Sequence, residues 1–197
     1  LLFLPISFGP YASEAQKKLT FSFIKKSIIF CREKISLDLL KSMNSSKDDL
    51  YYSPDLAFYH KFKNISALSK KLKSKYIVLS AREWFSKSKQ EKFEKTLSDF
   101  INWMWDQYKL KTIFVIMANN SAEESDIEVA NRIKKGVYDK KAFEVFFPID
   151  YIDVQSLLNN AYASICTRMH TAILSSTVLT PFIMIGYGHK SVGVVNT

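Results

Sequence analysis

The sequence contains few of the residues that mark metal, disulfide or nucleotide sites. Its 197 residues include two cysteines and three histidines. Cys31 and Cys166 each end an apolar run and form no CxxC pair, which favours reduced thiols and gives no basis for a zinc site. The GxGxxG, GxxxxGK[ST], GxSxG and HExxH motifs are all absent. We therefore expect neither a metal nor a bound cofactor.

The sequence also lacks long apolar runs. No segment reaches the roughly 18 uninterrupted apolar residues that indicate a membrane helix. The opening LLFLPISFGP has no basic start and is interpreted as a strand and turn, not a signal peptide. Because the chain begins within a strand and without Met, we interpret it as an internal part of a longer protein. The expected location is the cytoplasm, with peripheral association at the inner face of the membrane as an open alternative.

Positive charge is concentrated in one stretch. The net charge is +9, and residues 61–75 supply six lysines and no acidic residue. The flanking parts are nearly neutral, so 61–75 is interpreted as a solvated connector between domains at 1–60 and 76–197. Contact of the connector with an acidic surface, either a membrane leaflet or an anionic polymer, is the alternative. Nucleic acid is not an expected partner, because a nucleic-acid-binding domain would spread basic residues over a folded face.

Strand and helix patterns alternate along almost the whole chain. Near-continuous apolar strands alternating with amphipathic helices predict parallel sheets covered on both faces. We therefore expect an α/β fold of two doubly wound, Rossmann-like parallel-sheet units, the first of them incomplete. The predicted strands are 1–6, 27–31, 49–60, 76–81, 111–118, 143–148, 163–166 and 180–187. Capping boxes are predicted to open helices at Ser88–Glu91 and Ser121–Glu124, the second helix ending at Gly136.

Cationic and polar side chains follow these strands where the strands end. Open parallel sheets bind ligands outside the carboxyl ends of their strands, where helix N-termini converge. Three of the four arginines occupy such places, and the guanidinium fork binds carboxylates and phosphates through two parallel hydrogen bonds. We interpret this edge as an anion site. The candidate residues are Arg32, Arg82, Asn119, Arg168, His170 and Lys190.

Most candidates also have a structural interpretation. His170 taken alone suits a core histidine that donates to a carbonyl, and Lys190 taken alone suits a surface lysine. The neighbours Arg32-Glu33 and Arg82-Glu83 are equally consistent with ion pairs at helix starts. Two carboxylates are ambiguous as well: Asp55 follows a proline and suits a turn, and Asp126 suits the first turn of a helix, where it would complement the dipole. Asp126 is retained as a candidate cleft residue with Arg32 and Asn119.

Five segments in order resemble the polysaccharide pyruvyl transferase family. They are SFGPY, CREKIS, SPDLAF, VLSAREW and SICTRMHTAILSSTVLTPFIMIGYGHKSVG. The resemblance implies two Rossmann-like domains facing across a cleft, as in GT-B glycosyltransferases, with most of the N-terminal domain missing from this chain. The RMH segment and PFIMIGYGHKSVG are its most specific parts.

The resemblance implies transfer of a pyruvyl group from phosphoenolpyruvate to a sugar of a surface polysaccharide or glycopolymer. Arg82, Arg168 and Lys190 would hold the carboxylate and phosphate of the donor, and His170 and Lys190 would be catalytic. The acceptor would be a saccharide or a lipid-linked saccharide.

Two other functions remain open. A GT-B glycosyltransferase with a nucleotide-sugar donor would show the same fold and basic edge, but would need an acidic residue for the ribose, and none is identified. A non-catalytic module that binds an anionic polymer through Lys70, Lys71 and Lys73 would leave the cations at the strand ends unexplained.

Overall fold

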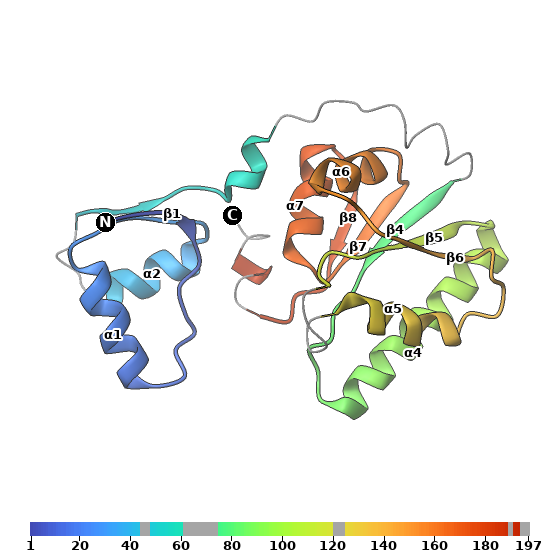
Figure 1. Ribbon diagram of the computed structural model, residues 1–197, viewed down its shortest axis with the longest axis horizontal. Coiled ribbons are helices and arrows are strands. Elements are labelled where there is room, and N and C mark those ends of the chain that lie inside the picture. The colour runs from blue at the N-terminus through green and yellow to red at the C-terminus, as the bar shows by residue number, and fades with distance from the viewer. Residues whose placement is uncertain (44–47, 61–74, 120–124, 189–190, 194–197) are drawn as a thin grey trace. The chain divides into compact units, whose positions relative to one another are not determined.

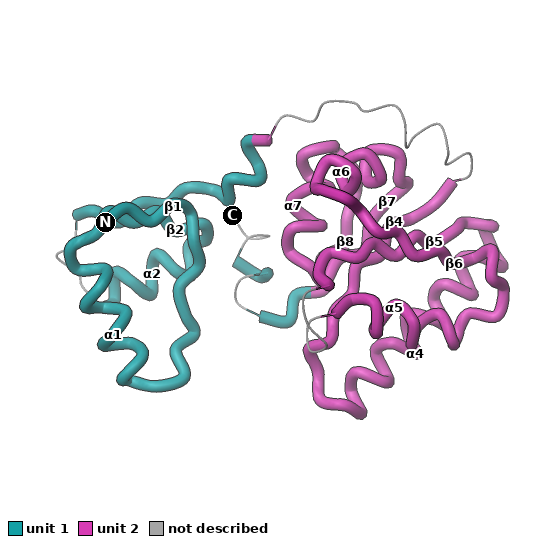
Figure 2. Tube along the Cα trace, in the orientation of Figure 1, with its two compact units in different colours: residues 1–59, 186–197 teal, residues 60–185 magenta. Residues whose placement is uncertain are grey.

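The computed structural model describes residues 1–43, 48–60, 75–119, 125–188 and 191–193. The chain divides into two compact units (Figure 2). Unit 1 contains Leu1–Tyr59 and Gly186–Thr197, and unit 2 contains His60–Ile185. Most of the predicted connector, residues 61–74, lies outside the described residues.

The end of the chain groups with unit 1, which differs from the expected boundary at 76–197. Close packing accounts for the difference. A Cβ atom added to Gly193 would lie only 2.6 Å from Cγ of Glu33 in unit 1. The chain therefore returns to the first unit after its last strand, and a side chain larger than hydrogen at position 193 would displace Glu33.

Unit 1 is built on a three-stranded parallel sheet of order β1-β2-β3 (Figure 1). Its elements are β1 (Leu2–Ile6), α1 (Glu14–Ile24), β2 (Ile28–Cys31), α2 (Lys34–Met43), β3 (Leu50–Tyr52) and the 3₁₀ helix η1 (Leu56–Tyr59). The core joins one face of the sheet to the helices, with Ile24, Ile29, Cys31, Leu37, Leu40 and Leu50 buried. On β1 the alternate residues Leu2, Leu4 and Ile6 are exposed. Within the described part of unit 1 the helices thus cover one face of the sheet, not both.

Unit 2 contains a five-stranded parallel sheet of order β6-β5-β4-β7-β8. The strands are β4 (Tyr76–Ser80), β5 (Lys111–Val115), β6 (Phe143–Phe146), β7 (Ala163–Cys166) and β8 (Phe182–Met184). The helices are α4 (Lys87–Tyr108), α5 (Asp126–Lys135), α6 (Tyr151–Asn159) and α7 (Met169–Thr177). Helices α4 and α5 lie on one side of the sheet, and α6 and α7 on the other (Figure 1). This is the predicted doubly wound, Rossmann-like arrangement.

Two apolar cores hold the helices of unit 2 to the sheet. Side chains of successive strand residues point to opposite faces, so each strand contributes to both cores. The first contains Leu79 and Phe114 with Leu97, Ile101, Val129 and Ile133 of α4 and α5. The second contains Val78 and Ile113 with Val154, Leu157, Leu158 and Leu174 of α6 and α7. Burial on both faces explains why the strands are almost continuously apolar in the sequence.

Two helix starts differ from the sequence prediction. The prediction that a capping box at Ser88–Glu91 opens the helix is wrong, because α4 begins at Lys87 with Ser86 as its N-cap. Helix α5 begins at Asp126 after Ser125, and the box predicted at Ser121–Glu124 falls mainly outside the described residues. The predicted end of this helix at Gly136 is confirmed. Among the described residues, no helix combines the length and apolar character needed to cross a bilayer.

Both cysteines are buried and unpaired. Burial raises the pKa of the Cys166 thiol from 9.0 to about 11, and burial together with the nearby Glu33 charge raises that of Cys31 to about 12. Since the thiolate is the reactive form, we expect native protein at pH 8 to react with iodoacetamide at least about 100-fold more slowly than urea-unfolded protein. Mass spectrometry of quenched time points measures both rates. Equal rates would contradict the burial of the thiols.

Candidate functional site

The carboxyl edge of the unit 2 sheet has a topological switch point between β4 and β7. The chain runs from β4 outward through β5 to β6, and then crosses to β7 on the other side of β4. Helices that follow these two central strands leave on opposite faces, which opens a crevice where ligands bind in this class of fold. Ser80 is aligned with Cys166 at the ends of β4 and β7. Arg82 and Arg168 each follow two residues later, so the fold brings these two predicted donor-binding residues to neighbouring loops.

A buried threonine joins the two loops. The hydroxyl oxygen of Thr167 accepts the backbone N–H of Arg82 at 3.1 Å, and the N–H of Thr167 donates to the carbonyl of Ser80 at 2.9 Å. Thr167 is 3 % exposed. The loop that carries Arg82 and the loop that carries Arg168 are thereby fixed to each other.

Asp126 organises the same edge from within. Its side chain is fully buried, and Oδ2 accepts the backbone N–H groups of Met117 and Ala118 at 3.0 Å each. Its Oδ1 accepts from Nε and Nη2 of Arg168. One carboxylate therefore connects the start of α5, the loop after β5 and the residue that precedes α7. The interpretation of Asp126 as a complement to the helix dipole is incomplete, because its main partners lie on other elements.

The ion pair also defines how Arg168 is presented. Its side chain is 14 % exposed. The Nε and Nη2 edge of the guanidinium contacts Asp126, so this edge of the fork is already bound to a protein carboxylate. His170 is exposed and is the second residue of α7, and Arg168 occupies the N-cap position of this helix without a side-chain capping hydrogen bond. The donor-site roles of Arg168 and His170 stay predictions.

Arg82 is half-buried after β4. Its guanidinium carbon lies 5.3 Å from the ring centroid of Trp84, a cation–π distance, and its Nε donates to the carbonyl of Glu83 at 3.4 Å. The side chain of Glu83 is bound instead by Arg132 of α5, at 2.7 Å. Glu83 therefore pairs with Arg132, 49 residues away in the sequence. Among the described residues, this pair takes the place of the ion pair of Arg82 with Glu83 that the sequence suggested.

Gln90 of α4 holds the loop that follows Arg82. It is 3 % exposed, and its Oε1 accepts the backbone N–H groups of Trp84 and Phe85 at 3.2 Å each. Its Nε2 donates to Glu94 at 2.7 Å and to the carbonyl of Arg82 at 3.4 Å. We call Gln90, Glu94 and Arg132 the loop clamp.

Arg132 completes the loop clamp from α5. Its Nε and Nη2 donate to the two oxygens of Glu94 at 2.8 and 2.9 Å. The pKa of Arg132 is raised, mainly by its hydrogen bond to Glu94. The loop clamp was not predicted from the sequence. The available sequence signal was the spacing of Gln90 and Glu94, two polar residues that continue the apolar face of Leu97 and Ile101 toward the start of the helix.

Arg32 lies in unit 1, in a polar cluster at the carboxyl edge of that sheet. Its Nη1 donates to Asp55 at 2.8 Å and its Nε donates to Ser7 at 2.7 Å, with Glu33 at 3.7 Å. Asp55 also accepts the N–H of Ala57, two residues on, at 3.0 Å. The structural interpretations of Arg32 with Glu33 and of Asp55 in a turn are thus both observed, while a ligand-binding role of Arg32 stays a prediction.

The remaining candidates are less defined. Lys190 lies outside the described residues. Asn119 is exposed and accepts the hydroxyl of Ser125 at 3.4 Å. No group of three or more His, Cys, Asp or Glu side chains with metal-binding geometry occurs within the described ranges.

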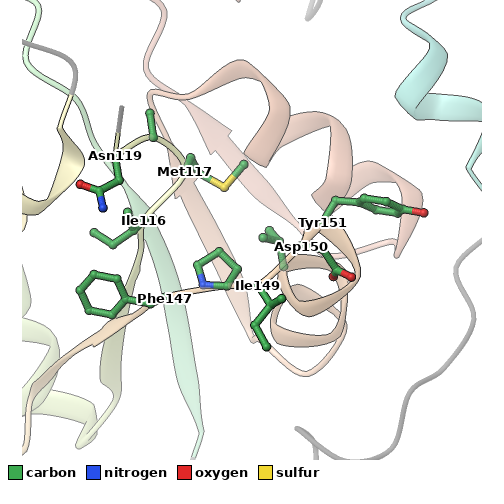
Figure 3. A pocket seen from close by; sticks show the side chains of 10 residues that line it. Ile116, Met117, Asn119, Phe147, Ile149, Asp150 and Tyr151 are labelled. Atoms are coloured by element: carbon green, nitrogen blue, oxygen red, sulfur yellow. The ribbon is translucent and has the colours of Figure 1, made fainter. Parts of the chain in front are cut away.

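A pocket of about 410 Å³ opens at the carboxyl edge of the unit 2 sheet (Figure 3). It lies between the segment after β5 and the segment that joins β6 to α6. Its lining residues are Ile116, Met117, Ala118, Asn119, Phe147, Pro148, Ile149, Asp150, Tyr151 and Val154.

A protein-family model described as polysaccharide pyruvyl transferase matches residues 1–189. The chain belongs to this family. One relative is the amylovoran biosynthesis protein AmsJ of Erwinia amylovora, which is 25% identical to this chain over 205 residues. The match covers 96% of this chain and 49% of AmsJ, so the chain spans about half the length of that relative.

Solved structures with a similar fold include enzymes named for nucleotide-sugar chemistry. UDP-GlcNAc 2-epimerase from Neisseria meningitidis bound to UDP-GlcNAc matches with a TM-score of 0.66 and 14% identity, over 95% of this chain and 51% of that chain. A putative UDP-N-acetylglucosamine 2-epimerase from Listeria monocytogenes matches with a TM-score of 0.64 and 10% identity, over 95% and 49%. At these identities, the similarity shows that the chain has a GT-B-like, Rossmann-type fold. It does not show which ligands the chain binds.

The buried ion pair leads to a prediction for Asp126→Asn. An amide keeps the shape but cannot accept from Arg168 and from both backbone N–H groups at once. Removing one partner of a buried ion pair costs about 3–5 kcal/mol, so we expect a loss of that size in the free energy of unfolding of unit 2. Urea denaturation followed by tryptophan fluorescence measures it. Glu128→Gln, an exposed substitution on the same helix, is the matched control and should change stability by less than about 0.5 kcal/mol. Equal effects of the two substitutions would contradict the organising role of Asp126.

The loop clamp leads to a second prediction. Gln90→Leu keeps the side-chain volume approximately but removes the acceptor for two backbone N–H groups. We expect a stability loss of about 1–3 kcal/mol and faster amide hydrogen exchange at Trp84 and Phe85. Hydrogen exchange measured by NMR tests this. Asp99→Ala removes an exposed ion pair with Lys95 on the same helix and should leave exchange in residues 82–85 unchanged. Unchanged exchange in Gln90→Leu would show that the clamp does not hold the loop.

Proposed function

We propose that the chain carries the donor site of an enzyme that transfers a pyruvyl group from phosphoenolpyruvate to a saccharide, forming a pyruvyl ketal. Membership of the polysaccharide pyruvyl transferase family supports a transferase in polysaccharide biosynthesis. The more specific proposal depends on one observation: hydrogen bonds hold the loops that carry Arg82 and Arg168 together at the switch point. Thr167 fixes the loop of Arg82, and buried Asp126 fixes Arg168.

The donor requirements match this edge. Phosphoenolpyruvate carries a carboxylate and a phosphate, and Arg82, Arg168 and the N-terminus of α7 supply positive charge and N–H donors for them. Lys190 is proposed as a further ligand and catalytic residue. Because Nε and Nη2 of Arg168 contact Asp126, removal of the Arg168 side chain would leave a buried carboxylate unpaired, so Arg82 is the donor ligand chosen for substitution.

The proposed reaction proceeds in two additions. A proton is added to the methylene carbon of phosphoenolpyruvate, and the oxygen of one sugar hydroxyl bonds to C2 and loses its proton. The C2–O bond to phosphate then breaks, phosphate leaves, and a second sugar hydroxyl bonds to C2 to close the ketal, releasing its proton. His170 is proposed to exchange one of these protons, since it is exposed and histidine is the side chain that most often serves as a general acid or base.

The proposed acceptor is a saccharide or a lipid-linked saccharide. We place the reaction in the cytoplasm, with peripheral association at the inner face of the membrane in the case of a lipid-linked acceptor. No cofactor is proposed, because phosphoenolpyruvate itself supplies the transferred group.

Calorimetric titration with phosphoenolpyruvate tests the donor site. We expect saturable binding that Arg82→Ala weakens by about tenfold or more, because a charge-assisted hydrogen bond contributes about 1.5–3 kcal/mol. Lys89→Ala, which removes one exposed positive charge from α4, controls for net charge and should leave affinity unchanged. His170→Ala should bind donor but abolish transfer in the full-length parent. Equal effects of Arg82→Ala and Lys89→Ala would contradict the site, and displacement of phosphoenolpyruvate by UDP would favour a nucleotide-sugar donor.

A further inference from the structure

The pocket that follows β5 and β6 has no part in the donor chemistry described so far. Its wall contains apolar side chains that remain accessible: Phe147 is 58 % exposed and Ile149 is 95 % exposed. In Figure 3 the thioether of Met117 extends from the β5 side, while Phe147 and Tyr151 lie at opposite ends of the lining. Accessible apolar side chains at the ligand-binding edge of a parallel sheet indicate a surface that a ligand covers.

The polar groups of the pocket restrict the class of ligand. The described lining includes no lysine or arginine, and it contains the carboxylate of Asp150, so a second anion is disfavoured. Asp150 caps α6 through Oδ1, which accepts the N–H groups of Ile152 and Asp153 at 2.8 and 3.0 Å. Within the described residues Oδ2 has no hydrogen bond, so it can accept from a ligand hydroxyl. The exposed amide of Asn119 adds a donor and an acceptor.

A pyranose ring fits this combination. One face of the ring presents C–H groups, which pack on an aromatic surface such as Phe147, and its edge presents hydroxyls for a carboxylate and an amide. An alkyl chain would not use Asp150 or Asn119. The volume of about 410 Å³ lies within the roughly 300–1,000 Å³ range of small-molecule sites.

Hydrogen bonds connect the pocket to Arg168 of the proposed donor site. Met117 and Ala118 line it, and their backbone N–H groups are the two that Asp126 accepts. The opposite oxygen of the same carboxylate holds Arg168. A ligand in the pocket is therefore positioned by the loop whose geometry also sets Arg168.

We propose that this pocket is a saccharide subsite, which binds one pyranose ring of the acceptor glycan with Phe147 as its apolar platform and Asp150 and Asn119 as its hydroxyl partners. Its assignment to the acceptor rests on the proposed pyruvyl transfer, whereas saccharide binding itself does not.

Methionine methyl groups report on the two sites separately. Met117 lines the pocket, Met169 is the first residue of α7 between Arg168 and His170, and Met43 and Met104 lie elsewhere. With [methyl-¹³C]methionine protein, we expect titration with the methyl glycosides of galactose, glucose and mannose to shift the Met117 signal saturably for at least one sugar. Signals of Met43 and Met104 should not move. Phosphoenolpyruvate should shift Met169.

Phe147→Ala tests the platform. We expect it to weaken saccharide binding about tenfold, equivalent to about 1.4 kcal/mol, while the response of Met169 to phosphoenolpyruvate is kept. Phe147→Trp should retain saccharide binding because it preserves an aromatic surface. The matched control is Phe23→Ala on α1, a phenylalanine that is 59 % exposed.

The outcomes separate the two proposals. A Met117 signal that no glycoside moves, or a shift that survives Phe147→Ala, would overturn the saccharide subsite. A shift of Met117 by uridine monophosphate but by none of the sugars would overturn it in favour of a nucleotide pocket. If glycosides shift Met117 and phosphoenolpyruvate fails to bind, the subsite stands and the proposed donor is wrong.

Discussion

The carboxyl edge of unit 2 depends on the buried carboxylate of Asp126. A charged group without solvent is costly unless its hydrogen-bonding capacity is filled, and here four donors fill it: two backbone N–H groups after β5 and two nitrogens of Arg168. The need to fill this hydrogen-bonding capacity constrains both sets of donors. The loop after β5 must reach the carboxylate, and Arg168 must turn toward it, so three elements adopt one arrangement at the place where a ligand would bind.

Two sets of hydrogen bonds therefore hold the loops at the switch point. Asp126 orients Arg168 from the β5 and α5 side, and the loop clamp holds residues 82–85 from the α4 side. Thr167 joins them through the backbone N–H of Arg82. A site whose charged groups are held before the ligand arrives avoids part of the ordering cost of binding. The arrangement accounts for buried polar residues on helix faces that otherwise pack against apolar strands.

Family membership and fold contribute different information. The matching family model and the relative AmsJ carry names from polysaccharide chemistry, while the solved structures of similar fold include nucleotide-sugar epimerases at 10% and 14% identity. A shared fold explains a shared location of ligand sites at the carboxyl edge, but the residues at that edge decide the chemistry. Two arginines and a histidine at the switch point suit a small, multiply charged donor. The neighbouring pocket, apolar with a carboxylate and an amide, suits an uncharged polyhydroxy ring.

The sequence by itself determined the fold class and the sheet edge at which Arg82 and Arg168 lie. Apolar strands alternating with amphipathic helices leave a parallel sheet as the only way to bury both strand faces, and parallel strands place Arg82 and Arg168 at one edge. Only the tertiary structure decided their partners. Arg168 meets Asp126 from 42 positions away and Glu83 meets Arg132 from 49, and local sequence contains no signal for such pairings. The misplaced start of α4 has a local reason instead. Gln90 binds the backbone N–H groups of Trp84 and Phe85, six and five residues before it, and this contact is not part of the capping pattern that predicted a start at Ser88.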